Sequence, residues 1–275
     1  MIGRAEATLN KQILIPLPSY GFDPTETAIP WKVLKSAGFR IIFATPEAQV
    51  AAADRRTLTG EGLPSILVGS FVASPEAVQT YSEMTASEEF QDPIAYRDIQ
   101  PDNYDALILP GGHDKGMREY LESETLRLVV AYFFDRNKPV GAICHGLLLP
   151  ARTRTMNNSN RSVLWGKRTT SLTRRQERLS YQLTRLWIGD HYQTYKTLVQ
   201  DEVISNLCSP DDYVSGPEFF VPVQRDTETD LSPGFAVVDG NFVSARWPGD
   251  IHKFTYEFKR LWSNSRYEVL SSLTV

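Results

Sequence analysis

The sequence predicts an α/β fold, in which a mostly parallel central sheet carries helices on both of its faces. Short apolar runs alternate along the chain with longer amphipathic segments, and this alternation is typical of β-α-β units. The apolar runs are continuous, as expected for strands that are buried on both faces. With 275 residues, 41% of them hydrophobic, the chain is long enough to bury a full core. We expect residues 1–275 to form a single domain.

The first β-α-β unit lies between residues 12 and 46. The apolar run over 12–17 predicts a strand, and the segment TAIPWKVLKSAGF predicts a helix that ends at Gly38. The β-rich run FRIIFAT, residues 39–45, then stops at Pro46. Two parallel strands joined in this way need a right-handed crossover.

The alternation continues further along the chain. Buried strands are predicted over 105–112 and 138–144, and an amphipathic helix over 123–137 lies between them. The chain then becomes polar and rich in arginine, and we expect a helical, basic insert around residues 150–210.

Four more elements are predicted toward the C-terminus. Helical patterns cover residues 176–189 and 195–207. A hairpin is expected around the turn Asp239-Gly240, which is a strong local turn signal. A last helix is predicted over residues 249–262.

Composition indicates a cytoplasmic protein. The formal net charge of −4 and the isoelectric point near 5.7 give no global attraction to nucleic acid or to an anionic membrane. The longest apolar stretches fall well below the roughly 18 residues that span a bilayer, and the N-terminal segment lacks the long apolar region of an export signal. Two cysteines are too few for a disulfide framework and fit a reducing compartment. We expect neither nucleic acid nor membrane as a partner.

Positive charge is concentrated between Arg152 and Arg185, where nine Lys/Arg residues accompany a single acidic residue, Glu177. This segment could bind an anionic ligand, or it could be a solvated surface balanced by acidic residues elsewhere. We favour the surface interpretation.

Cys144 has the sequence context of a catalytic nucleophile. In AICHG it follows a predicted strand and precedes a probable helix, with the small residues Ala142 and Gly146 on either side. This is the pattern of a nucleophile elbow, whose sharp turn needs small neighbours and presents the nucleophile at the carboxyl edge of the sheet. A helix N-terminus would also favour the thiolate. An inert core cysteine is the alternative, and we favour the nucleophile.

Two other loops should end at the same edge of the sheet. The segment Pro110-Gly111-Gly112-His113 follows a predicted strand, and its glycines let backbone N–H groups approach a substrate as in an oxyanion hole. Glu26 follows the first strand at or near a helix start. An ordinary turn and a favourable helix-dipole charge would explain these two features singly, but their convergence with Cys144 indicates a site.

The stretches GFDPTETAIPWKVLKSAGFRIIFATPEA, YDALILPGGHDKGM, PVGAICHGLL, LVQDEVISNL and GFAVVDGNFVSARWPGD resemble the ThiJ/PfpI superfamily. The likeness is greatest to the branch of heat-shock chaperones and glutathione-independent glyoxalases, and it covers about residues 11–262. The resemblance implies a flavodoxin-like three-layer sandwich of the class I glutamine amidotransferase type. The helical segment after the nucleophile elbow is an insertion that a minimal relative lacks.

The resemblance also implies residue roles. Cys144 would be the nucleophile, His145 its histidine partner and Glu26 the carboxyl group at the sulfur. Glu177 matches the acidic residue that orients the histidine in the glyoxalase branch. The oxyanion hole would involve Gly111, Gly112 and the backbone of His145.

The sequence departs from its relatives near the last strand, where it has ARWPGD instead of a Gln-Asn-Pro-x-Ser-like run. This places Arg246 and Trp247, together with His113, among the expected substrate-binding residues. Because His252 is followed by Lys253 and Phe254, the chain lacks the histidine and glutamate of a glutaminase, and the amidotransferase activity is disfavoured.

The resemblance implies a glyoxalase III-like lyase or hydrolase that uses Cys144, His145 and Glu26. A small reactive carbonyl such as methylglyoxal would form a hemithioacetal on Cys144, with no metal or other cofactor. One alternative is a cysteine-dependent hydratase, hydrolase or lyase for a larger metabolite. Another is a redox-sensing or holdase stress chaperone. Relatives are often dimers, and we expect a homodimer.

Overall fold

A seven-stranded sheet forms the centre of the computed structural model, which describes residues 11–217 and 224–272. The strand order is β10-β11-β7-β6-β1-β3-β5, and every neighbouring pair is parallel except β10 with β11. The strands are β1 Gln12–Pro16, β3 Arg40–Thr45, β5 Ile94–Ala95, β6 Ala106–Leu109, β7 Val140–Ile143, β10 Ala236–Asp239 and β11 Phe242–Ala245. The predicted mostly parallel sheet is confirmed.

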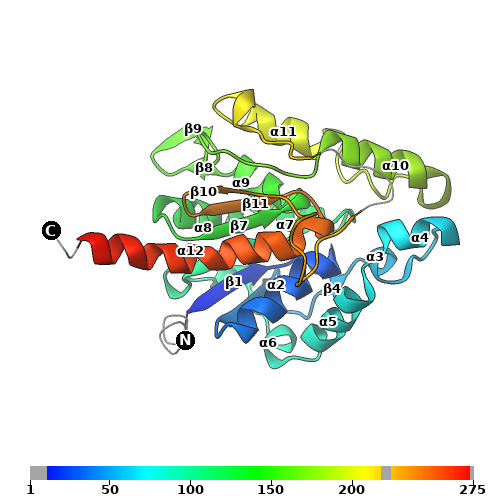
Figure 1. Ribbon diagram of the computed structural model, residues 1–275, viewed down its shortest axis with the longest axis horizontal. Helices are drawn as coiled ribbons and strands as arrows, with labels where there is room; N and C mark the ends of the chain where they lie inside the picture. Colours follow the sequence, from blue (N-terminus) through cyan, green and yellow to red (C-terminus); the bar gives the residue numbers. More distant parts are fainter. Residues whose placement is uncertain (1–10, 218–223, 273–275) are drawn as a thin grey trace.

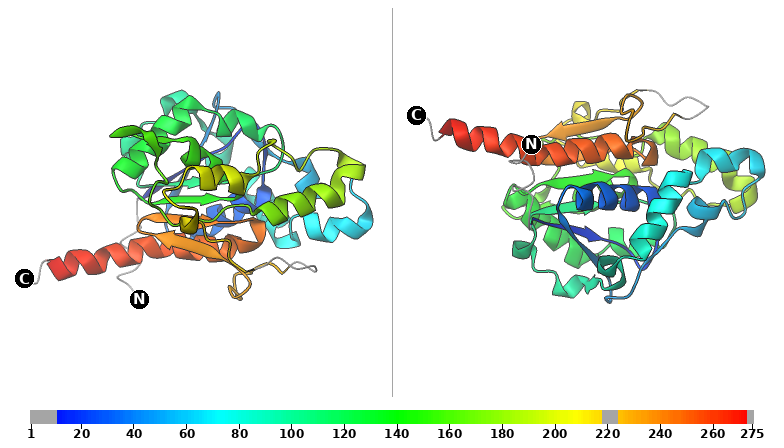
Figure 2. Two further views of the ribbon diagram at one scale, coloured as in Figure 1. Left: turned by 90° about the horizontal axis from the view of Figure 1, so that it is seen from above. Right: turned by 60° about the horizontal axis from the view of Figure 1, so that its bottom comes forward.

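Helices cover both faces of this sheet (Figures 1 and 2). Helices α2, Pro24–Ser36, and α12, Ile251–Ser272, pack against each other on one face, and α8, Glu124–Asp135, lies on the other. The buried residues of α8 include Leu126, Val129, Val130 and Phe133, whose spacing places them on one face of the helix. The resulting three layers match the predicted architecture.

Several elements lie outside the sequence-based predictions, and most of them are short. The segment between β3 and β6 contains β4 Ala52–Ala53, α3 Arg55–Thr59, α4 Ser65–Phe71, α5 Pro75–Thr85, α6 Glu88–Gln91 and the turns η1 Tyr96–Asp98 and η2 Pro101–Asn103. The others are β2 Tyr20–Phe22, which pairs with β4, and α7 Met117–Leu121. A helix of one or two turns shows little of the 3.6-residue period that identifies longer helices.

The region after the elbow is partly helical. It comprises η3 Cys144–Leu147, α9 Leu148–Arg152, a small hairpin of β8 Arg154–Thr155 and β9 Asn158–Ser162, α10 Arg174–Ile188, α11 Val199–Ser205 and η4 Pro210–Asp212. The helix predicted over 195–207 therefore begins only at Val199. A further turn, η5 Pro248–Asp250, precedes α12, which extends well beyond the predicted residue 262.

Three of the nine Lys/Arg residues of the basic segment are paired with acidic side chains from other elements. Arg152 makes a two-pronged ion pair with Glu202, Arg174 pairs with Asp201, and Lys167 lies 3.5 Å from Asp239. These pairs agree with the surface interpretation of the basic segment. Within the described ranges, none of the helices has the combination of length and apolarity that a bilayer span requires.

Candidate active site

Cys144 lies in a sharp turn at the carboxyl end of β7. Its backbone has a φ of 57°, in the left-handed region that non-glycine residues avoid at a cost of about 1–3 kcal/mol. Two residues later, Gly146 is so close to the end of the neighbouring strand β6 that a Cβ atom there would lie 2.2 Å from the carbonyl oxygen of Leu109. The strain and the close packing are those of a nucleophile elbow.

Replacing Gly146 by alanine should destabilise the protein strongly, because the new methyl group would collide with backbone rather than with a movable side chain. We expect a loss of at least about 3 kcal/mol in the free energy of unfolding, or failure to fold. Gly69→Ala is the matched control: Gly69 lies within α4 with no neighbour within 4 Å of its added methyl group, and this change should stabilise the protein by about 0.5–1 kcal/mol. Similar unfolding curves for the two variants would contradict the packing described for the elbow.

His145 directly follows the nucleophile and turns its ring back toward it. Its Nδ1 atom lies 3.6 Å from the Cys144 sulfur. Burial, aided by the charge of Arg152, lowers the pKa of His145 to about 3. The imidazole is therefore neutral at physiological pH.

Glu26 reaches the same point from the first turn of α2. That helix begins after Asp23, whose side chain accepts hydrogen bonds from the backbone N–H groups of Thr25 and Glu26. The Glu26 carboxyl is fully buried, accepts the Gly111 N–H at 2.7 Å and contacts the Cys144 thiol. Burial and the negative charges of Asp23 and Asp250 raise the pKa of Glu26 well above 4.5, which favours the protonated carboxyl.

Glu26 and Cys144 are coupled acids. Burial and the charge of an ionised Glu26 raise the pKa of the Cys144 thiol, whereas the backbone N–H of His145 lowers it. The expected helix N-terminus contributes little, because a 3₁₀ turn and the five-residue helix α9 follow the cysteine. When Glu26 is protonated its charge no longer opposes the thiolate, and its O–H can donate to the sulfur. The two groups are therefore expected to lose their protons one after the other, since an ionised Glu26 raises the pKa of the thiol.

Gly111 and Gly112 follow β6 beside these groups. A Cβ atom at Gly111 would lie 2.8 Å from three atoms: Cβ of Cys144, Oε2 of Glu26 and the backbone nitrogen of His145. The N–H of Gly111, predicted as an oxyanion-hole donor, is instead hydrogen-bonded to Glu26, so this part of the prediction is corrected. The backbone groups of Gly112 and His145 remain the proposed donors.

Glu177 is placed in α10 and is buried, but it is not hydrogen-bonded to His145. Its Oε2 atom accepts the backbone N–H of Val199, at the start of α11. Both Glu177 Oε1 and His145 Nε2 lack a hydrogen-bond partner in the described part of the chain. The role of Glu177 in orienting His145 stays a proposal, which requires these two atoms to form a hydrogen bond.

Glu177→Gln tests both the burial of this carboxyl and its proposed role. Burial raises the pKa of Glu177 from 4.5 to about 7, so the folded protein binds this proton more tightly than the unfolded chain. The stability that this tighter proton binding gives the folded protein is fully present below pH 4.5, and it is lost as the pH rises through about 7. Because glutamine does not ionise, the stability of the variant relative to wild type should rise by about 2 kcal/mol between pH 5 and pH 8, as measured by denaturant unfolding.

Parallel pH–stability curves of the two proteins would contradict the raised pKa. If Glu177 also orients His145, the same variant should lose at least about tenfold in kcat, a change that a purely structural bond to Val199 would not produce.

The three predicted substrate-binding residues divide into two groups. His113 and Trp247 are both buried and line a pocket described below. Arg246 does not line this pocket: its side chain donates two hydrogen bonds to Asp250 and a third to the carbonyl oxygen of Pro217. It lines a separate pocket beside α10, so its contact with substrate stays a prediction.

Two residues of the site were missed by the sequence analysis. Asp23 is buried with a pKa raised to about 6, chiefly by burial, and its charge acts on Glu26. The signal was present, because aspartate followed three residues later by glutamate is a helix N-terminus pattern. Tyr120 is fully buried, and burial together with the negative charge of Glu26 raises the pKa of its hydroxyl. No local sequence pattern marks it.

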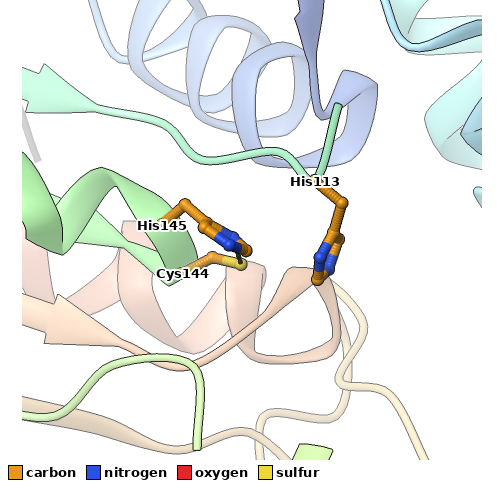
Figure 3. A group of neighbouring side chains, drawn as sticks. All are labelled: His113, Cys144 and His145. Carbon is orange, nitrogen blue, oxygen red and sulfur yellow. Dashed lines mark hydrogen bonds between the residues drawn. The ribbon is translucent and has the colours of Figure 1, made fainter. Parts of the chain in front are cut away.

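Two clusters could hold a metal ion. In the first, the donor atoms of His113, Cys144 and His145 lie within 4.8 Å of one another, and Figure 3 shows the thiol beside the His145 ring on the side that faces His113. Two imidazoles and a thiolate are ligands that Zn²⁺ accepts. The second cluster is Asp54, Asp114 and His191. There the guanidinium of Arg56 lies 3.4 Å from His191 Nδ1, and its positive charge disfavours a cation.

The fold and the elbow together define a class of α/β proteins with a cysteine at the carboxyl edge of a parallel sheet. A family model described as ThiJ/PfpI family-like matches residues 17–217. The chain belongs to the ThiJ/PfpI family, and the resemblance found in the sequence is confirmed.

Individual relatives agree with this assignment. An uncharacterised protein of Schizosaccharomyces pombe is 34% identical over 131 residues, which cover 47% of this chain and 46% of that protein. The deglycase PfpI of Pyrococcus furiosus is 28% identical over 170 residues, covering 61% of this chain and 68% of the deglycase. The match thus spans less than half of the fission-yeast protein and about two thirds of the deglycase.

A solved structure shares the fold. Glyoxalase III of Candida albicans superposes with a TM-score of 0.64 over 91% of this chain and 97% of the enzyme. At 17% sequence identity this likeness is one of fold.

Proposed function

We propose that the protein is a cysteine-dependent enzyme of the glyoxalase or deglycase type, acting on a small reactive carbonyl without a metal or organic cofactor. The observation that best supports this proposal is the convergence of the Cys144 thiol, the neutral His145 imidazole and the buried Glu26 carboxyl at one point of the sheet edge. The names of the archaeal deglycase and the Candida glyoxalase point in the same direction.

In the first step the sulfur of Cys144 attacks the aldehyde carbon of methylglyoxal. A carbon–sulfur bond forms, the carbonyl π bond becomes an alkoxide, and His145 Nδ1 takes the thiol proton. Backbone N–H groups near Gly112 and His145 stabilise the alkoxide. The alkoxide then takes the proton held by His145, which completes the hemithioacetal and leaves the imidazole neutral.

In the second step a proton moves between the two neighbouring carbons of the adduct. His145 or Glu26 removes the hydrogen of the hemithioacetal carbon, and a proton returns to the adjacent carbon, which gives a thioester of lactate. Water then hydrolyses the thioester and releases lactate and the free thiol. The sum of these steps is the addition of one water molecule to methylglyoxal.

The test is production of lactate from methylglyoxal by the purified protein, in buffer that contains neither glutathione nor metal. We expect turnover that is unchanged, within about twofold, after prolonged treatment with a chelator, since every proposed group belongs to the chain. A loss of activity that zinc restores would contradict the metal-free mechanism and would direct attention to the cluster of His113, Cys144 and His145.

A further inference from the structure

A pocket of about 360 Å³ opens next to the candidate active site. It lies between α4 and α10, which are side by side at one end of the molecule in Figures 1 and 2. Its walls are predominantly apolar, and the side chains that form them include Leu67, Phe71, Leu172, Leu179, Leu183 and Trp247.

The inner wall of the pocket is only one side chain away from the nucleophile. Asp23 and His113 both line it. The His113 ring is 4.8 Å from the ring of His145, and a nitrogen of His113 lies within 4.8 Å of the Cys144 sulfur. A molecule whose carbonyl group reaches the sulfur past His113 would extend its remaining atoms into this pocket.

The size of the pocket does not match methylglyoxal. That molecule has about five heavy atoms and displaces roughly three waters, or about 90 Å³. The pocket is about four times larger and falls in the range of about 300–1,000 Å³ in which proteins bind larger organic ligands. Methylglyoxal would leave most of the apolar wall in contact with water.

Among the described residues that line the pocket, Arg225 is the one lysine or arginine, and it is already partnered. The guanidinium of Arg225 donates to the carbonyl oxygens of Ser70 and Val72, each at 3.1 Å, and lies 5.5 Å from the centre of the Trp247 ring. Its charge also acts on the carboxyl group of Asp23. The pocket therefore favours an uncharged apolar group over an anionic one.

We propose that the pocket receives the apolar substituent of the substrate, so that the preferred substrates are 2-oxoaldehydes with a long alkyl chain or a ring. This inference rests on the proposed glyoxalase-type function of Cys144 and specifies its substrate class. The remote apolar group would supply binding energy that methylglyoxal lacks.

The test is a series of 2-oxoaldehydes of increasing chain length, from methylglyoxal to 2-oxooctanal, assayed with wild-type protein. Each methylene group that enters an apolar pocket should increase kcat/KM about fourfold. We expect 2-oxooctanal to exceed methylglyoxal by a factor on the order of 10² or more. A kcat/KM that is flat or falls with chain length would overturn the inference, and if methylglyoxal is still consumed in a Cys144-dependent manner the proposed function survives.

Absence of Cys144-dependent turnover along the whole series would instead overturn the proposed function itself. The two failures are therefore distinguishable.

Two leucines of α10 provide a matched pair of variants. Leu183 lines the pocket and is 37% exposed, whereas Leu186, three residues later, is 80% exposed and lies outside it. Leu183→Trp should reduce kcat/KM for 2-oxooctanal at least about tenfold while methylglyoxal changes by less than about threefold. Leu186→Trp should change neither. An equal loss for both substrates in Leu183→Trp, or no loss for 2-oxooctanal, would contradict a pocket for the chain.

Discussion

Replacing Cys144 by alanine should lower kcat/KM for the reactive carbonyl at least about 10³-fold, because no other group in the site can form the covalent adduct. The protein should remain folded. Cys144 is 1% exposed, and loss of one sulfur atom from a small side chain should lower the melting temperature by only a few degrees. The measurement is lactate formation at matched protein concentration, together with a thermal unfolding curve.

The second cysteine provides the control. Cys208 is exposed on the surface, and both cysteines are free thiols. Cys208→Ala should retain full activity, so any thiol-dependent turnover is assigned to Cys144. Appreciable turnover by the folded Cys144→Ala protein would refute the proposed nucleophile.

Replacing Glu26 by glutamine should reduce kcat about 10²-fold, because the amide cannot exchange a proton with the substrate. The fold should be preserved, since the amide oxygen can still accept the Gly111 N–H that Glu26 accepts at 2.7 Å. Glu26→Ala, by contrast, leaves that buried N–H without an acceptor and should also cost about 1–3 kcal/mol of stability.

The protonation state of Glu26 can be tested in the same variant. If the carboxyl is protonated in the wild-type protein, the pH profile of Cys144 alkylation by iodoacetamide should move by less than about half a pH unit in Glu26→Gln. If Glu26 were ionised, removal of its negative charge would lower the pKa of the thiol and shift the profile to clearly lower pH. Such a shift would contradict the proton that burial places on Glu26.

Local patterns predicted the centre of the fold and the elbow because the determining contacts are close in sequence or follow from a general rule. Cys144 and Gly146 belong to one tight turn, so their spacing alone indicates it. Glu26 and Gly111 could be placed beside them because the carboxyl ends of parallel strands lie at one edge. The use of the Gly111 N–H by Glu26 could not be predicted, since it depends on the packing of α2 against the loop after β6.

The pocket could not be predicted from the sequence, for a different reason. Its walls come from α4 and α10, which are more than one hundred residues apart in the chain. Helix α4 has only seven residues and no side-chain cap, so no sequence pattern predicts a helix there. Arg246 illustrates the same limit, because a buried arginine is equally suited to a substrate and to Asp250, and only the fold decides.

The proposed function depends on a covalent bond between Cys144 and the carbonyl carbon of the substrate. The most direct measurement is a carbon-13 NMR spectrum of the protein with methylglyoxal labelled at the aldehyde carbon, recorded for wild type and for Cys144→Ser. If Cys144 is the nucleophile, a hemithioacetal or thioester carbon signal should appear only in the wild-type protein and should disappear as labelled lactate accumulates. Formation of lactate with no sulfur-bound carbon in the wild type, or an equal rate of lactate formation by Cys144→Ser, would contradict it.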